Sequence, residues 1–389
     1  MKLKKNIEEK KRVVIALSGG VDSSVAALML KSSGHEVIAI YMKNWHDKSL
    51  TKNNECPWVQ DSNDALQVAE QIGIPFHVID LSKDYEKRII EYMFNQYKNG
   101  LTPNPDVLCN KEIKFKIFLN YALKLNADYI ATGHYCQKKE TNGKIKLLQG
   151  KDVNKDQSYF LCQVNKKQLK KVIFPIGHLE KSKVREIAKE HKLITHNKKD
   201  SQGLCFVGKI KLPVFLNSKI KKQNGKIIEI SSKSKVYSTQ KNEYKEPIYC
   251  ENDGNLIGYH NGSFQYTIGQ RKGIEVGGKP KPLFVIATNI KKNIVFVGMG
   301  DQHPGLFRKG LCISLNKSNW IDENNKIKNG ESKNFLVRIR HRQPLQKANI
   351  KVVENTIYIK FKKKQRGISK GQFAAWYLKN ELIGSGPID

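Results

Sequence analysis

The 389-residue sequence has no two cysteines in a CxxC spacing and no apolar run near the roughly 20 residues that span a bilayer. Its seven cysteines are widely spaced and odd in number, which argues against a secreted disulfide framework. Zinc ribbons and iron–sulfur clusters normally show close cysteine pairs, so we expect neither zinc nor such a cluster. The polar N-terminus, MKLKKNIEEKKR, has no apolar signal core. We therefore expect a cytoplasmic protein with reduced thiols and no membrane partner.

Acidic residues are few: 36 Asp and Glu stand against 69 Lys and Arg, a formal net charge of +33. Such a charge favours a polyanionic partner, above all nucleic acid, although a compositional bias of the genome toward lysine would also raise it. Arginine is scarcer still, and three of the nine arginines, Arg338, Arg340 and Arg342, fall within five residues. Because guanidinium groups bind phosphates and base edges in a bidentate manner, this cluster indicates nucleic-acid recognition.

Strands and helices alternate as far as about residue 205. The apolar runs predict strands at 12–17, 36–42 and 76–81, with helices beginning at Asp61 or Ser62 and over about 83–98, 111–125 and 181–191. This alternation predicts an α/β domain with a parallel sheet of the nucleotide-binding type.

The composition changes after Gly208. Residues 209–249 look loop-rich and basic, and from about 283 onward short β-branched and aromatic runs predict a small C-terminal β-barrel. We therefore expect three domains, 1–208, 209–282 and 283–389. A basic stretch within 230–255 is either a solvated loop or an extension of a nucleic-acid footprint.

The segment Ser18–Ser24, SGGVDSS, lies between a predicted strand and a predicted helix. Glycines let the backbone approach an anion, while hydroxyls and amides at a helix N-terminus donate to phosphate oxygens. Asp22 could hold Mg²⁺ beside the phosphates. The bland alternative is a Gly-Ser turn that only caps a helix. The segment is not a GxxxxGK[ST] loop; it resembles the PP-loop ATP pyrophosphatases, which implies attack at the α-phosphate of ATP.

Two of the cysteines lie in rigid, polar contexts. Cys109 follows Asn104-Pro105-Asp106 at a predicted helix start, where the helix N-terminus and Lys111 would lower the pKa of its thiol. Cys205 lies in KDSQGLCF, beside glycine and polar groups. An arbitrary cysteine is more often inert and buried, but these contexts make both thiols candidates for reactivity.

The motifs TPNPDVLCNKEIKF, ATGHY, KDQSYFL, KDSQGLCF and YTIGQRKG occur in this order along most of the chain. Together they resemble the tRNA-specific 2-thiouridylase family. The resemblance implies a PP-loop domain, a small central domain and a C-terminal β-barrel. It also implies conversion of the wobble uridine at position 34 of tRNA, in glutamate, glutamine and lysine acceptors, to 2-thiouridine, with a persulfide donor or relay protein as a second partner.

The resemblance further implies a role for each matching residue. ATP, with Mg²⁺, would be bound by Ala16, Leu17, Ser18, Gly19, Gly20, Val21, Asp22, Ser23, Met42 and Gly133. The tRNA would be contacted by Asn104, Pro105, Asp106, His134, Lys155, Asp156, Gln157, Arg340, His341 and Gln372. Asp106 would also assist proton transfer. Cys205 would carry the persulfide, and Cys109 would act on it, releasing sulfide or closing a transient Cys109–Cys205 disulfide.

Two other functions fit parts of the sequence. An amidating ligase of the same superfamily would use the phosphate loop but would need an ammonia source and no cysteine pair. A basic RNA-binding protein with a vestigial nucleotide fold would bind RNA without turnover.

Overall fold

The first domain is built on five parallel strands in the computed structural model, which describes residues 10–44, 57–199 and 212–389. The strand order is β3-β2-β1-β4-β7. The strands are β1 (Arg12–Ala16), β2 (Glu36–Lys43), β3 (Phe76–Asp80), β4 (Tyr129–Ala131) and β7 (Val172–Ile173). Near-continuous apolar runs such as RVVIA are typical of strands buried on both faces. The predicted parallel sheet is confirmed.

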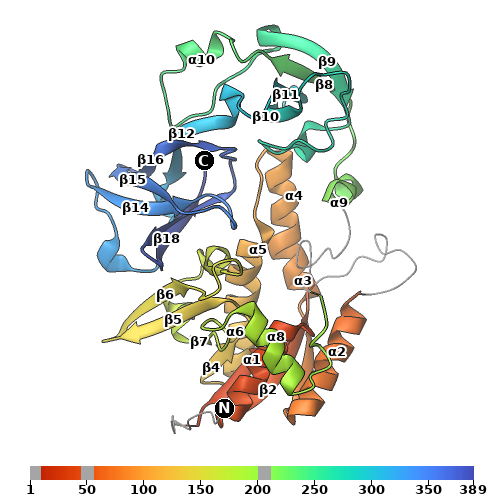
Figure 1. Ribbon diagram of the computed structural model, residues 1–389, viewed down its shortest axis with the longest axis vertical. Helices are drawn as coiled ribbons and strands as arrows, with labels where there is room; N and C mark the ends of the chain where they lie inside the picture. The colour runs from red at the N-terminus through yellow and green to blue at the C-terminus, as the bar shows by residue number, and fades with distance from the viewer. Residues whose placement is uncertain (1–9, 45–56, 200–211) are drawn as a thin grey trace.

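Helices cover both faces of this sheet (Figure 1). One core packs α1 (Val21–Ser32), α2 (Pro57–Ile72) and α8 (Lys181–Glu190) against one face. The other core packs two long helical stretches against the opposite face. They run from α3 (Ser82–Tyr85) to α4 (Glu91–Lys98) and from α5 (Pro105–Leu108) to α6 (Leu119–Lys124), each through a π-helical segment, Glu86–Ile90 and Cys109–Phe118.

Two of these helices begin earlier than predicted. Helix α2 begins at Pro57, so Asp61 and Ser62 lie inside it rather than at its cap. The helix expected from about 111 begins at Pro105, because the Asn104 side chain accepts a hydrogen bond from the Val107 amide and caps it. This shift places Cys109 in the second helical turn.

The central domain is a four-stranded sheet of order β10-β11-β8-β9. Its strands are β8 (Gly225–Ile230), β9 (Gly254–His260), β10 (Leu283–Asn289) and β11 (Ile294–Met299), and α9 (Leu212–Lys219) and α10 (Val236–Thr239) accompany them. Strands β10 and β11 were expected in the C-terminal barrel, and that part of the predicted division at 282/283 is wrong. Their β-branched runs look like barrel strands, but β11 pairs in parallel with β8 instead.

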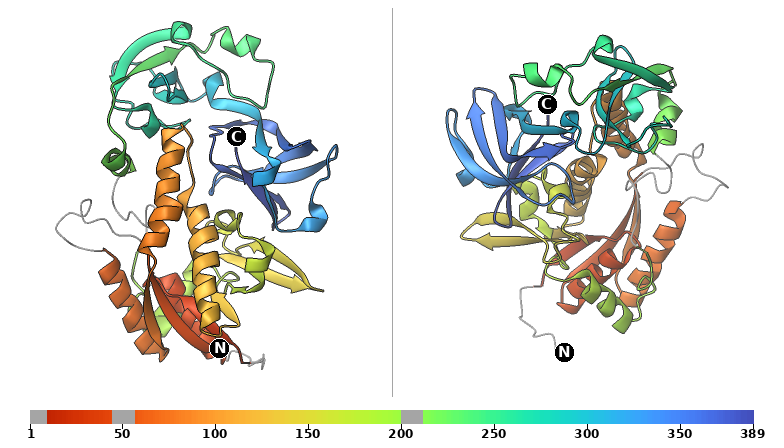
Figure 2. Two further views of the ribbon diagram at one scale, coloured as in Figure 1. Left: turned by 180° about the vertical axis from the view of Figure 1, so that it is seen from behind. Right: turned by 45° about the horizontal axis from the view of Figure 1, so that its top comes forward.

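The C-terminal barrel has the strand order β12-β16-β15-β14-β17-β18-β6-β5, with β13 paired to β18. Its own strands are β12 (Phe307–Ser314), β13 (Asn319–Trp320), β14 (Ser332–Arg338), β15 (Gln346–Val353), β16 (Thr356–Arg366), β17 (Phe373–Leu378) and β18 (Glu381–Pro387). The last two strands of that order, β5 (Cys136–Thr141) and β6 (Lys144–Gln149), form a hairpin of the first domain. Figure 2 shows this hairpin lying beneath the barrel.

The stretch within 230–255 packs on the barrel. Glu246 pairs with Lys370 at 2.8 Å, Glu243 pairs with Lys360, and the Tyr244 ring lies 5.1 Å from that of Tyr358. Of the two predicted roles, the solvated loop is therefore wrong for residues 243–246, because they tie the central domain to the barrel. Helix α4 links the first domain to the central domain (Figure 1). The ring centroid of Phe94 in α4 lies 5.1 Å from that of Phe215 in α9.

No helix among these described stretches is both long and apolar enough to cross a membrane.

Candidate functional site

The strand order of the first sheet reverses between β1 and β4. In open α/β sheets the loops at such a point diverge and leave a crevice at the carboxyl ends of the strands. Here the two loops are Leu17–Gly20, after β1, and Thr132–Tyr135, after β4. Ala16 ends β1, Leu17 follows it, and Met42 lies near the same end of β2. The sheet therefore brings most of the predicted ATP-binding residues to one edge.

The phosphate loop is held by close backbone packing. Gly19 has φ +70°, and a Cβ there would lie 2.2 Å from the Asp61 carbonyl oxygen of α2. A Cβ on Gly133 would lie 2.7 Å from the Ser23 amide nitrogen. Both positions thus require glycine, one for its conformation and both for space. Among these residues the Ser23 hydroxyl accepts from the Ser18 amide at 3.2 Å and donates to the Gly20 carbonyl at 3.0 Å.

Helix α1 begins at this loop with no side-chain cap on its first amides. Unpaired amides and the helix dipole together make such an end suitable for an anion. The geometry of the loop therefore favours the anion-binding interpretation over a turn that only caps a helix. Its shape fits the phosphates of a nucleotide lying across the crevice.

Asp22, in the first turn of α1, is fixed by two donors. The Tyr135 hydroxyl and the Lys181 ammonium group each lie 2.7 Å from its Oδ1. Its Oδ2 has no hydrogen-bond partner within the described residues, and a carboxylate oxygen suits a magnesium ion. Asp22 thus fits the predicted Mg²⁺ ligand, as a single ligand to an ion held mainly by phosphates. Over residues 10–44, 57–199 and 212–389 no group of three or more His, Cys, Asp or Glu could hold a metal by itself.

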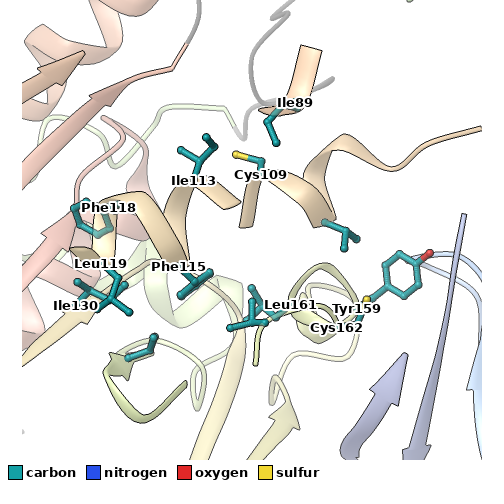
Figure 3. Close-up of a cluster of buried hydrophobic side chains, with 14 of the residues drawn as sticks. Ile89, Cys109, Ile113, Phe115, Phe118, Leu119, Ile130, Tyr159, Leu161 and Cys162 are labelled. Atoms are coloured by element: carbon teal, nitrogen blue, oxygen red, sulfur yellow. The ribbon is translucent and has the colours of Figure 1, made fainter. Parts of the chain in front are cut away.

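Cys109 lies in the core between the first sheet and the helices. It is 1% exposed, and Figure 3 shows its sulfur beside Ile89 and Ile113. The residue opens the π-helical segment Cys109–Phe118. Such segments are rare and often occur at functional sites. The helix thus presents the thiol to the core in this conformation.

The predicted lowering of the Cys109 pKa is wrong for this conformation. Burial raises the pKa of the thiol, and the Asp106 charge adds to the rise, while Lys114 and a hydrogen bond with Tyr85 oppose it. Lys111 was expected to act on the thiol, but its ammonium group reaches Gln163 Oε1 at 3.4 Å. Because the helix begins at Pro105, its N-terminal amides also lie a turn away from the sulfur.

Residues 104–106 lie where the first domain meets the barrel. Asn104 Nδ2 donates to Gln372 Oε1 at 3.3 Å, and Gln372 Nε2 donates to the Pro103 carbonyl at 3.3 Å. Asp106 is half-buried, and its Oδ1 is enclosed without a hydrogen-bond partner in the described structure. A buried polar atom without a hydrogen-bond partner destabilises the fold unless a ligand or a water molecule donates a hydrogen bond to it. The fold therefore brings together three residues that are predicted to contact tRNA, namely Asn104, Asp106 and Gln372.

Asp156 lies in the joint between the two domains. It is 2% exposed, and its Oδ2 accepts from Arg338 at 3.0 Å and from Gln149 at 2.9 Å. The neighbouring Gln157 side chain accepts from the Tyr135 amide at 3.0 Å, and Lys155 is half-buried. The predicted tRNA contacts of Lys155, Asp156 and Gln157 stay predictions. The Asp156 carboxylate joins the first domain to the barrel through its hydrogen bond with Arg338.

Two residues predicted to contact tRNA from the barrel, Arg340 and His341, lie in different surroundings. His341 Nε2 lies 2.8 Å from the Asp156 carbonyl oxygen, and its ring packs on Phe160 at 4.3 Å. Arg340 is exposed and donates to the Gly367 carbonyl at 2.5 Å. Arg340 thus faces solvent near the joint, whereas His341 helps to build it.

His134 is 8% exposed and packs among aromatic rings. Its Nδ1 lies 2.7 Å from the Thr132 hydroxyl, and Phe115 and Phe174 flank the ring. Burial, with Lys114 second, holds its pKa well below the usual value, so the imidazole is neutral. These surroundings are those of a core histidine, and its predicted tRNA contact stays a prediction.

Comparison with known proteins accounts for all three domains. Family models match residues 11–209 (tRNA methyl transferase HUP domain), 214–299 (tRNA methyl transferase PRC-barrel domain) and 311–388 (aminomethyltransferase beta-barrel domain). A tRNA-specific 2-thiouridylase MnmA from Flavobacterium johnsoniae is 52% identical over 97% of this chain and 100% of its own length. The chain belongs to the tRNA-specific 2-thiouridylase family. Members from Karelsulcia muelleri and Bacillus subtilis are 49% and 41% identical, each over 98% of this chain and over 99% and 95% of their own lengths.

Sequence reasoning missed three residues that contact or adjoin the candidate site residues. Lys181 reaches Asp22 from α8, Tyr85 meets the Cys109 thiol, and Asn110 donates to the Phe160 carbonyl at 3.1 Å. Of these three, only Asn110 belongs to a motif that carries the family resemblance, TPNPDVLCNKEIKF. Lys181 is the first residue of the helix predicted over 181–191, one lysine among many, and its position gave no local signal.

Cys205, the second predicted cysteine, lies outside the described residues, as does the predicted Cys109–Cys205 disulfide.

Proposed function

We propose that this chain is an enzyme that thiolates tRNA. It adenylates the C2 oxygen of uridine 34 with ATP and then replaces that oxygen by sulfur from a cysteine persulfide. The products are 2-thiouridine, AMP and pyrophosphate. The observation that carries the proposal is the match to a named 2-thiouridylase over 97% of this chain and 100% of the relative.

The phosphate loop supports the first step. The C2 oxygen of uridine is a poor leaving group, and adenylation converts it into a phosphate ester that leaves easily. The first amides of α1 would bind the phosphates of ATP, and Lys181 beside Asp22 would add a positive charge. Asp22 would hold a Mg²⁺ ion, whose chemistry when bound is to neutralise phosphate charge.

The 104–106 segment supports the placement of the base. The target uridine stacks in the anticodon loop and must be turned out of it to react. Asn104 and Pro105 would meet the base, and the unpartnered Asp106 Oδ1 would take part in proton transfer. His134, Lys155, Asp156, Gln157, Arg340, His341 and Gln372 would complete the tRNA contacts, several of them by supporting the joint.

Two cysteines would carry out the sulfur transfer. The terminal sulfur of a Cys205 persulfide attacks C2, and AMP leaves with the oxygen. The Cys109 thiolate then attacks the Cys205 sulfur, which breaks the S–S bond to the uridine sulfur and forms a Cys109–Cys205 disulfide. In the alternative order Cys109 attacks the persulfide first and releases hydrosulfide as the nucleophile. Either order requires the buried Cys109 thiol to become accessible.

The finer points of the proposal concern partners. The tRNA substrates would be glutamate, glutamine and lysine acceptors, a persulfide donor or relay protein would load Cys205, and the compartment would be the cytoplasm.

Nucleoside mass spectrometry of tRNA, after reaction with ATP and a sulfur donor, tests the function. Cys109→Ser and Cys205→Ser should each abolish 2-thiouridine while tRNA binding persists. Normal thiolation by either variant would overturn the mechanism. Pyrophosphate release that needs ammonia and a small molecule, but no tRNA, would instead favour an amidating ligase. Binding of tRNA without turnover would favour an RNA-binding protein.

A further inference from the structure

A groove of about 610 Å³ is lined by residues of β12, β14, β15, β16 and β17 of the barrel and by the residue that follows β17. Lysines dominate its polar lining: Lys309, Lys347, Lys360, Lys362 and Lys379. Among the described residues that line it, none is acidic. The groove is therefore a concave surface of one charge sign, away from the phosphate loop.

Strand geometry explains why these lysines converge. Lys360 and Lys362 are two positions apart on β16, so they project from the same face about 7 Å apart. Ala348 lies opposite Phe361, which places Lys347 of β15 next to Lys362. Like charges in such cross-strand positions are unfavourable. A bound polyanion would remove that repulsion.

Most of this charge is uncompensated inside the protein. Lys360 pairs with Glu243 of the central domain. The other four lysines make no ion pair with any residue that the structure describes. Four ammonium groups on flexible stems are thus available to an anion that lies along the groove.

The floor of the groove does not fit a base. The Tyr377 and Phe361 rings that line it are 0% and 1% exposed, so no base can stack on them. Asn349 Nδ2 donates to Asn334 Oδ1 at 3.0 Å, which occupies one donor and one acceptor of these two amides. The groove therefore offers mainly charge and few groups that could read a base.

We infer that the lysine groove binds the phosphate backbone of RNA, as a second contact surface separate from Arg340 and Gln372. The inference rests on the proposed function, which supplies a tRNA as the polyanion. Charge complementarity supports it, because five lysines line the groove, four of them make no ion pair with a described residue, and the RNA backbone is a polyanion.

Neutralisation of the groove tests the inference. The full-length triple variant Lys347→Gln, Lys362→Gln and Lys379→Gln removes three charges. A matched control, Lys31→Gln, Lys124→Gln and Lys189→Gln, removes the same charge from exposed lysines of the first domain. The affinity for a tRNA transcript is measured by filter binding as a function of salt concentration, and thermal unfolding confirms that both variants fold.

The groove variant should lose about 1 from the slope of log K against log salt for each lysine, about 3 in all, and the control should keep the wild-type slope. An unrelated RNA of the same length should show the same loss, because the groove offers mainly charge. Equal slopes for the groove and control variants would overturn the inference. So would loss of binding to a polyaspartate peptide with an unchanged tRNA slope, which would assign the groove to an acidic protein.

The two proposals fail separately. Normal thiolation with a wild-type slope in the groove variant overturns only the groove. A reduced slope in a chain that never forms 2-thiouridine upholds the groove and overturns the proposed function.

Discussion

Asn104 and Gln372 form a reciprocal contact between the first domain and the barrel. Asn104 Nδ2 donates to Gln372 Oε1, Gln372 Nε2 donates to the Pro103 carbonyl, and both distances are 3.3 Å. Asn104 also caps the helix that carries Asp106 and Cys109. The barrel therefore helps to set the position of the segment proposed to receive the base.

Gln372→Ala should lower kcat/KM for tRNA about tenfold, because about 1.4 kcal/mol of hydrogen bonding at the joint is lost. The affinity for ATP should change little, since the phosphate loop lies at another edge of the first domain. Steady-state thiolation and ATP binding measure the two effects. The matched control is Gln346→Ala, whose side chain donates, among the described residues, only to the nearby Pro344 carbonyl; an equal loss in that variant would contradict the prediction.

Alkylation should distinguish Cys109 from Cys250. Burial raises the pKa of Cys109 above the usual value of 9.0, whereas Cys250 is exposed. At pH 8 iodoacetamide should label Cys250 at least about 100-fold faster, because Cys109 is both enclosed and protonated. Peptide mass spectrometry gives both rates in one sample. Labelling of Cys109 should rise through pH 9, and comparable rates at pH 8 would show that the thiol is not buried.

Asp156→Asn should destabilise the protein by about 3 kcal/mol, because it leaves the Arg338 guanidinium buried without its counter-charge. The control Glu186→Gln removes one partner of the exposed Lys183 pair and should change the free energy of unfolding far less. Urea unfolding measures both. Similar effects of the two substitutions would mean that the buried pair does not secure the joint.

His134 should make stability fall at acid pH. Its folded pKa lies well below 6.5, so the native state excludes a proton that the unfolded state takes up as the pH falls through 6.5. The contribution of His134 to the free energy of unfolding is fully present above pH 6.5 and is about 1.4 kcal/mol smaller at pH 5.5. The difference in unfolding free energy between pH 8 and pH 5.5 should therefore be smaller in His134→Asn than in the wild type. An identical pH dependence would contradict the burial of a neutral ring.

Local pattern predicted the parallel sheet and the phosphate loop, because strand runs and glycine turns are properties of neighbouring residues. It could not predict the partner of Asp22, since Lys181 lies 159 residues further along the chain. The pKa of Cys109 was misjudged for a related reason. The motif shows polar neighbours, but exposure depends on helices 82–98 and 105–124 closing over the thiol.

The assignment of β10 and β11 failed because a β-branched run shows that a strand forms but not which sheet it joins. Pairing of β11 with β8 and of β6 with β18 is a long-range choice. Repeated strand runs near one end of a chain thus predict β structure well and domain boundaries poorly.

The hairpin of β5 and β6 gives the order of synthesis a structural consequence. Lys146 pairs with Glu381, 235 residues later, and β6 pairs with the last strand of the chain. While the ribosome makes the intervening residues, this edge of the nascent first domain has no partner strand. Unpaired edges invite aggregation, so the growing chain is exposed to it until β18 emerges. Loss of β18 would leave the earliest domain with an open edge.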